Sequence, residues 1–261
     1  MSSNTQQWHL IGNGPGKAEI RPNERLIRFN QSDPGPKSST LVVSNGRGKG
    51  INQPFLVEGL QPPHDFERRL NETSGVLESR LGVRPSAGLT TLIALGEEPC
   101  SLRISCMDLL PTIARPEHLS NRQPLACCFH NWLGERRIAL PWARKLDWPG
   151  FWLSELEGSK LSQASDPYPR LLSLSSIERQ EGLTLIRWLA RLPHACWKTH
   201  ATEELLMHAE HLFFLKRGVR DTSNWWIFDF EASGLMARIH RTLAMAQQAL
   251  LSPVQALPES L

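Results

Sequence analysis

The sequence contains no stretch that approaches eighteen consecutive apolar residues, and its N-terminus is polar. The first absence argues against a membrane-spanning helix, and the second against a secretory signal with a basic start and an apolar centre. The formal net charge is only +3 over 261 residues, which does not demand a nucleic-acid partner. We therefore expect a cytoplasmic protein that binds no nucleic acid and meets the inner membrane at most peripherally.

Cysteine is also scarce, with five residues and no Cys-x-x-Cys pair. An odd number of cysteines without a secretory signal indicates reduced thiols rather than a disulfide framework. Metal binding has little support, because His208 and His211 are the only C-terminal histidines at ligand spacing on one predicted helix. We expect surface histidines there, with a metal site as the alternative, and we expect no cofactor.

Tyrosine occurs once, whereas tryptophan occurs nine times. Tryptophan rings pack protein cores, stack on sugars or bases, or lie at membrane interfaces. Core packing is the default, but Trp225 and Trp226 follow the basic residues Lys216, Arg217 and Arg220. This group is a candidate for binding an anionic acceptor, such as a lipopolysaccharide core, or a membrane surface. A solvated loop beside a core strand is the alternative.

Short apolar runs in the first half are typical of strands and fall at residues 9–11, 24–30, 40–44 and 101–106. The first three end in polar or glycine-containing loops, as in a sheet that forms a ligand crevice at the carboxyl ends of its strands. Helical spacing predicts a surface helix over residues 66–81 and a buried helix over 86–95 with Ser86 as its N-cap. This order of elements indicates the α/β class.

The second half is predicted to be mainly helical. Helical spacing covers residues 182–192, 201–215 and 232–251. Residues 170–175 fit one more strand, and residues 225–230 fit an aromatic strand. A stretch rich in Trp and Pro and then in turn-forming residues, 141–169, is predicted to be a connector.

A glycine-rich loop, Gly-Asn-Gly-Pro-Gly, follows the first predicted strand at residues 12–16. Because glycine has no Cβ, backbone N–H groups in such a loop can approach an anionic or nucleotide ligand. The pattern matches neither the dinucleotide fingerprint nor the P-loop, and a tight strand-ending turn is the alternative. Residues 45–50, Asn-Gly-Arg-Gly-Lys-Gly, leave the same choice open after the third strand: a ligand loop or a flexible basic loop.

His130 and Glu135 lie five residues apart in a segment that can open a helix. Histidine is the first candidate for a general base, because its unperturbed pKa lies closest to neutrality. A nearby carboxylate would orient the ring or favour its cation. A packed or surface histidine is the alternative.

Four motifs, taken in order, resemble those of the sialyltransferase-like glycosyltransferases: Ile11-Gly-Asn-Gly-Pro15, Arg28-Phe-Asn30, Arg84-Pro-Ser-Ala-Gly-Leu89 with Leu102-Arg-Ile-Ser-Cys-Met-Asp-Leu109, and His130-x4-Glu135. Val42-Val-Ser-Asn-Gly-Arg47 and His130-Asn-Trp-Leu-Gly-Glu-Arg136 are similar to a bacterial branch often named urease operon accessory proteins. That name records gene neighbourhood rather than chemistry. The resemblance covers residues 1–140 and implies three parts: a nucleotide-sugar-binding domain at 1–140, the connector at 141–169 and a mainly helical C-terminal module at 170–261.

The resemblance implies a Rossmann-like GT-A-variant fold and an inverting, metal-independent transfer of sialic acid or Kdo from a CMP-sugar to a glycan or glycolipid acceptor. By motif, His130 would act as the catalytic base or assist departure of the CMP phosphate, with Glu135 supporting it. The substrate-binding residues implied or expected are Gly12, Asn13, Gly14, Arg28, Asn30, Asn45, Arg47, Ser86, Ala87 and Gly88. Two alternatives to an enzyme stay open: a catalytically inactive nucleotide-binding accessory protein, and a protein-interaction factor that uses the Trp-rich second half.

Overall fold

The computed structural model describes residues 7–30, 39–46, 54–96, 101–115, 119–120, 123, 130–154, 165–214 and 229–252. The chain divides into two compact units. Unit 1 consists of Met1–Leu109 and Pro141–Trp152, and unit 2 of Leu110–Leu140 and Leu153–Leu261. The units differ from the three predicted parts, because residues 110–140 belong with the C-terminal helices and residues 141–152 belong with the sheet.

Unit 1 is built on a five-stranded mixed sheet with the order β4-β3-β2-β1-β5. Its strands are β1 (Gln7–Ile11), β2 (Arg25–Phe29), β3 (Thr40–Asn45), β4 (Phe55–Gly59) and β5 (Ser101–Ser105). β1 pairs in parallel with β2 and β5, β2 pairs in parallel with β3, and only β4 runs antiparallel to its neighbour. The α/β class is therefore confirmed, and β4 is a strand that the sequence analysis did not predict.

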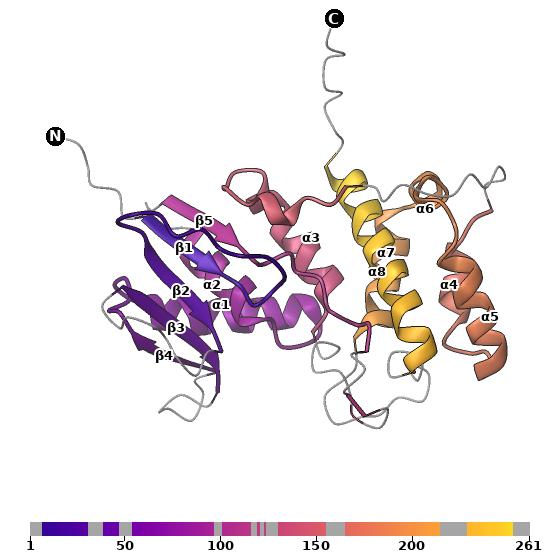
Figure 1. Ribbon diagram of the computed structural model, residues 1–261, viewed down its shortest axis with the longest axis horizontal. Coiled ribbons are helices and arrows are strands. Elements are labelled where there is room, and N and C mark those ends of the chain that lie inside the picture. Colours follow the sequence, from indigo (N-terminus) through magenta and orange to yellow (C-terminus); the bar gives the residue numbers. More distant parts are fainter. Residues whose placement is uncertain are drawn as a thin grey trace, which may run out of the picture. The chain divides into compact units, whose positions relative to one another are not determined.

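Two helices pack against this sheet (Figure 1), α1 (Phe66–Leu81) and α2 (Ala87–Gly96), as predicted. α1 buries one stripe of its surface, including Leu70 and Leu77, whereas α2 is buried along almost its whole length. The Ser86 hydroxyl accepts a hydrogen bond from the Leu89 N–H at 3.2 Å. This contact confirms Ser86 as the N-cap of α2.

Residues 141–152 belong to unit 1 because their aromatic side chains complete its core. The Trp142 ring lies where any side chain on Gly96 would be, so the end of α2 requires glycine at that position. The Trp148 indole N–H donates to the Met107 carbonyl at 2.6 Å, and Phe151 in the 3₁₀ turn Pro149–Phe151 is fully buried. The predicted connector is therefore a packed part of the sheet unit as far as Trp152.

Unit 2 is helical (Figure 1). Its helices are α3 (Trp132–Ala143, as far as Leu140), α4 (Tyr168–Ser173), α5 (Arg179–Leu189), α6 (His194–His200), α7 (Glu203–Glu210) and α8 (Phe230–Leu251). The predicted helices at 182–192 and 232–251 correspond to α5 and α8. The helix predicted over 201–215 is shorter, because α7 ends at Glu210 and a 3₁₀ turn, His211–Phe213, follows.

Two predictions for the second half need correction. Residues 170–175 were expected as a strand, but Tyr168–Ser173 form α4. Leu171 and Leu174 are both buried, and their spacing of three residues fits a helix rather than a strand. Of the aromatic strand expected at 225–230, residues 225–228 lie outside the described residues and Phe230 is the first residue of α8. None of the described helices combines the length and the apolar content that crossing a membrane requires.

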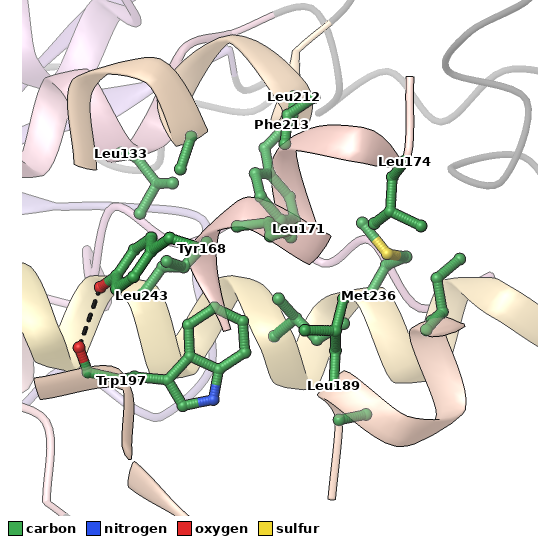
Figure 2. Packing of buried hydrophobic residues seen from close by; sticks show 14 of the residues in the cluster. Leu133, Tyr168, Leu171, Leu174, Leu189, Trp197, Leu212, Phe213, Met236 and Leu243 are labelled. Carbon is green, nitrogen blue, oxygen red and sulfur yellow. Dashed lines mark hydrogen bonds between the residues drawn. The ribbon is translucent and has the colours of Figure 1, made fainter. Parts of the chain in front are cut away.

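The core of unit 2 forms around α8. Figure 2 shows Met236 and Leu243 of this helix beside Leu171, Leu189 and other buried residues of the shorter helices. The only tyrosine of the chain, Tyr168, is fully buried here, and its hydroxyl donates to the Trp197 carbonyl at 3.1 Å. Each large apolar side chain buried in this way contributes roughly 1.5–3 kcal/mol.

A buried carboxylate fixes α3 within unit 2. Glu210 at the end of α7 accepts hydrogen bonds from Arg137 Nε at 2.8 Å and from Gln247 Nε2 at 3.3 Å. Gln247 also donates to the Leu133 carbonyl of α3 at 3.0 Å. Polar contacts of this kind specify one arrangement of helices, because each partner left alone would be buried without a hydrogen bond.

His240 of α8 is buried against the Phe213 ring, with ring centroids 4.9 Å apart. Within the part of the chain that the structure describes, neither of its ring nitrogens has a hydrogen-bond partner. Burial, with a smaller contribution from Arg136, lowers the pKa of His240 to about 3. His240 is therefore neutral in the folded protein at every pH above that value.

We predict that His240 makes the protein sensitive to mild acid. Below the unfolded-state pKa of 6.5, the unfolded chain binds a proton that the folded chain does not. The free energy of unfolding should then fall by up to about 1.4 kcal/mol per pH unit. Urea unfolding at pH 7, 6 and 5 should show a smaller slope for His240→Leu. The exposed His208 of α7 supplies the control, because His208→Leu should keep the wild-type slope. An unchanged slope in His240→Leu would contradict the prediction.

Candidate ligand site at the carboxyl ends of the strands

The carboxyl ends of β1, β2, β3 and β5 meet at one edge of the sheet, because these strands are parallel. We call the residues that end or follow them the carboxyl edge: Gly12–Gly16, Asn30, Asn45, Gly46 and Cys106. The Asn13 side-chain amide donates to the Phe29 carbonyl at 2.9 Å, and the Asn30 amide oxygen accepts from the Asn45 backbone N–H at 2.6 Å. Asparagine side chains thus link the ends of three neighbouring strands.

The three asparagines Asn13, Asn30 and Asn45 are all exposed. Asn30 has φ 51°, in the left-handed region that asparagine tolerates better than most residues. Two side-chain atoms, Asn30 Nδ2 and Asn13 Oδ1, are not used in the hydrogen bonds given above. The structure therefore brings these three predicted residues together, with amide groups able to bind a polar ligand.

The glycines of the first loop have a packing role. The N–H of Gly12 donates to the Ser105 carbonyl at 2.9 Å, and that of Gly14 donates to the Cys106 carbonyl at 2.8 Å. A Cβ on Gly12 would overlap the Cys106 carbonyl, and one on Gly14 would lie 2.8 Å from it. For these two residues the contacts support the tight-turn alternative, since their N–H groups are already bonded to the end of β5.

The start of α2 is joined to the carboxyl edge through Met107. A Cβ on Gly88 would lie 2.6 Å from the Met107 sulfur, and one on Gly12 would lie 2.8 Å from the Met107 Cβ. Met107 therefore fills the space between the β1 turn and the first turn of α2. Ser86, Ala87 and Gly88, predicted to hold a phosphate or carboxylate, are buried at this point.

Arg28 lies in the carboxyl-terminal half of β2 and is half-buried. The register places it beside Ile11 of β1 and Val42 of β3, on the same face of the sheet. Among the described residues, no carboxylate or carbonyl pairs with its guanidinium. The second predicted arginine, Arg47, lies outside the described residues, as do the basic residues Lys216, Arg217 and Arg220.

His130 and Glu135 belong to unit 2. His130 precedes α3 rather than lying within it, and Asn131 caps the helix by accepting a hydrogen bond from the Gly134 N–H at 3.0 Å. The His130 Nδ1 and the Glu135 Oε1 are 4.0 Å apart, and the His130 ring packs edge-on against Trp132. The two predicted catalytic residues are therefore electrostatic neighbours at a distance beyond a hydrogen bond, with Glu135 fully buried.

A buried polar cluster in unit 1 was not predicted. It consists of His9 in β1, Glu24 before β2 and Arg103 in β5, and we call it the His9 cluster. Arg103 donates to both Glu24 carboxylate oxygens, from Nε at 2.7 Å and from Nη2 at 2.5 Å. The same Nη2 lies 2.9 Å from His9 Nδ1, and His9 Nε2 lies 2.9 Å from the Ser105 hydroxyl. An arginine in the middle of the otherwise apolar Leu102–Ile104 run is the sequence signal that could have indicated it.

The charges of the His9 cluster shift two pKa values. Hydrogen bonds from Arg103 lower the pKa of Glu24 to about 2 against the opposing effect of burial. Burial, and then the charge of Arg103, lower the pKa of His9. The cluster therefore consists of an ionised Glu24–Arg103 pair beside a neutral imidazole.

Within the described residues, no three His, Cys, Asp or Glu side chains are grouped so that they could hold a metal ion. His208 and His211 are both exposed. The scan against family models gives no match, and the searches of curated proteins and of solved structures give none either.

We predict that Gly12 is required for the close approach of β1 to β5. Gly12→Ala places a Cβ against the Cys106 carbonyl, and such overpacking costs roughly 1–3 kcal/mol. Gly75 in α1 has nothing within 4 Å of its Cβ position, so Gly75→Ala should instead stabilise the helix by up to about 1 kcal/mol. Thermal unfolding of the two variants should shift the midpoint in opposite directions. Equal shifts would contradict the packing role.

We also predict that Arg103 stabilises unit 1 by pairing with Glu24. Arg103→Leu leaves a buried carboxylate without its partner, a change that costs about 3–5 kcal/mol. The stabilisation from the depressed pKa is complete above 4.5 and is lost as the pH falls toward about 2, so the variant should lose this part of the acid dependence. Arg68→Leu, which removes exposed ion pairs with Glu72 and Asp65, should cost far less, because exposed pairs add little to stability. Urea unfolding at pH 7 and pH 4 measures both effects, and similar losses in the two variants would refute the prediction.

Proposed function

We propose that unit 1 binds a CMP-activated acidic sugar, sialic acid or Kdo, at the carboxyl edge, and that the protein transfers this sugar to a glycan or glycolipid acceptor. The supporting observation is the meeting of Asn13, Asn30 and Asn45 from three neighbouring strand ends. Carboxyl ends of parallel strands are the usual place for ligands in α/β sheets. The finer assignment of unit 1 as a Rossmann-like GT-A variant is part of this proposal.

In the proposed reaction, the acceptor hydroxyl attacks the sugar carbon from the face opposite the leaving CMP, so the configuration at that carbon inverts. His130 takes the proton of the hydroxyl or assists departure of the phosphate, and Glu135 supports the imidazole. Hydrogen-bond donors at the departing phosphate lower the barrier by stabilising its charge, as backbone and amide N–H groups can do without a metal. We place the protein in the cytoplasm, with at most a peripheral contact to the inner membrane.

A nucleotide-binding accessory protein without transfer activity is the second candidate. It is favoured by the distance of 4.0 Å between His130 Nδ1 and Glu135 Oε1, which is too long for a hydrogen bond, and by the full burial of Glu135. Such a protein would use the same carboxyl edge for CMP but would not depend on His130.

Calorimetric titration with CMP, UMP and GDP tests the proposed function. Wild-type protein should bind CMP selectively. Asn30→Gly should weaken this binding at least tenfold, because the variant loses the amide but keeps the left-handed backbone. Asn23→Gly is the matched control, since Asn23 has φ 67° in the connection between β1 and β2 and lies outside the carboxyl edge. Absence of binding to any nucleotide would overturn the proposal and favour a protein-interaction factor.

His130→Ala separates the two candidates. In a transferase it should retain CMP binding within about twofold and lose at least a hundredfold in transfer or hydrolysis of CMP-sialic acid or CMP-Kdo, as expected for loss of a general base. CMP binding without turnover of either donor by the wild-type protein would support the accessory role.

A further inference from the structure

Arg28 carries an unpaired charge within the sheet of unit 1. It lies on β2, between β1 and β3, and is half-buried. Two other half-buried arginines of unit 1 are held by hydrogen bonds, Arg103 to Glu24 and Arg84 to the Pro54 carbonyl. For Arg28, the part of the chain that the structure describes supplies neither a carboxylate nor a carbonyl. The charge of Arg28 is therefore available to a ligand.

The neighbours of Arg28 on its face of the sheet are apolar. The register places Ile11 on one side and Val42 on the other, and Leu26 precedes Arg28 on the same face. All three side chains are buried. A charge in such surroundings loses part of its hydration, and this loss costs free energy unless an opposite charge replaces the water. The position of Arg28 thus opposes folding in the free protein and favours binding of an anion.

The same row of the sheet contains one carboxylate, that of Glu58 in β4. The register pairs Glu58 with Val42, so Glu58 and Arg28 are two strands apart. Neighbouring strands lie about 4.8 Å apart, which puts their Cα atoms about 10 Å from one another. Glu58 is exposed, and no ion pair joins it to Arg28 in the described structure. Glu58 therefore does not neutralise Arg28.

Arg28 lies beside the asparagines of the carboxyl edge. Asn30 follows it by two residues, and Asn13 Nδ2 donates to the carbonyl of the intervening residue, Phe29. Asn30 is joined in turn to the Asn45 N–H. Two residues of a strand span about 7 Å, and a nucleotide sugar is longer than this. One such ligand can therefore contact the amides and the guanidinium together.

The guanidinium limits the kind of ligand group that fits. It is planar, it only donates hydrogen bonds, and it keeps its charge at every physiological pH. Its parallel N–H groups match two oxygens of one carboxylate or phosphate. The chemistry of Arg28 therefore favours an oxyanion over a neutral hydroxyl.

We propose that Arg28 is the anion-binding residue of the carboxyl edge and pairs with an oxyanion of the bound donor, either the sugar carboxylate or the CMP phosphate. The inference rests on the proposed function, which supplies the anion. It goes further by assigning the negative charge of the donor to one side chain. It also implies that this side chain lowers the stability of the free protein, as is common for residues kept for function.

Thermal unfolding without ligand tests the unpaired charge. Arg28→Met keeps an unbranched stem and removes the charge, so its midpoint should equal or exceed that of the wild type. Arg103→Leu, which breaks the pair with Glu24, should instead lower the midpoint. Arg80→Met removes an exposed arginine of α1 and should leave it unchanged. A lower midpoint in Arg28→Met would show that Arg28 has a structural role and would overturn the inference.

Calorimetric titration tests the pairing with an oxyanion and identifies its source. The ligands are cytidine, CMP, and CMP-sialic acid or CMP-Kdo. If Arg28 pairs with the phosphate, Arg28→Met should weaken CMP binding roughly tenfold or more, as expected for hydrogen bonds to a charged group. If it pairs with the carboxylate, only the CMP-sugar should show this loss. Arg28→Lys, which keeps the charge without the planar fork, should lose less. Cytidine binding should not change, and Arg80→Met should match the wild type throughout.

The outcomes separate this inference from the proposed function. Wild-type protein that binds neither CMP nor a CMP-sugar would refute the proposed function and the inference with it. Wild-type binding that Arg28→Met leaves unchanged for every ligand would refute the anion-binding residue and leave the proposed function intact. An equal loss for cytidine would show that Arg28 acts on the nucleoside or on the fold, which also overturns the inference.

Discussion

The close packing of the β1 turn on the end of β5 is the contact on which the carboxyl edge depends. Gly12 and Gly14 donate their N–H groups to the carbonyls of Ser105 and Cys106, at a separation that leaves no space for a Cβ on Gly12. This contact fixes the position of the β1 turn relative to β5. The Asn13 side chain in that turn is thereby placed where it donates to the Phe29 carbonyl at the end of β2. It also seats Met107 between the turn and the start of α2. One steric constraint thus aligns the strand ends and the helix start at a single edge.

A second constraint lies behind that edge, in the His9 cluster. β1 occupies the centre of the parallel part of the sheet, with β2 on one side and β5 on the other. With this order, Glu24 precedes one neighbour of β1 and Arg103 lies in the other, and both side chains reach His9 Nδ1. The resulting ion pair lies against the imidazole, whose pKa is lowered by burial and then by the charge of Arg103.

Much of the local structure could be predicted from the sequence, whereas the pairings could not. The runs Leu41–Val43 and Leu102–Ile104 predict strands because their buried residues are apolar, and Ser86 predicts the start of α2 because its hydroxyl can accept from the first turn. The sequence does not predict β4 because only Phe55 of its five residues is buried, so that apolar and polar residues do not alternate along it. The six residues of α4 are too few for a helical period to be clear, so their sequence fits a strand as well.

The same distinction holds for the candidate site: residues that follow predicted strands could be predicted, whereas contacts that depend on strand pairing could not. Asn13, Asn30 and Asn45 could be found because each follows a predicted strand, and the carboxyl ends of parallel strands meet. The contact between His9 and Ser105 could not be found, since it depends on β5 pairing with β1 rather than with β3, and the chain order gives no such pairing. The motif of Arg28 suggests a substrate contact. The register pairs Ile11 with Arg28 on one side and with Ser105 on the other. A ligand held from both sides of Ile11 would therefore contact residues of β2 and β5, which lie far apart in the sequence.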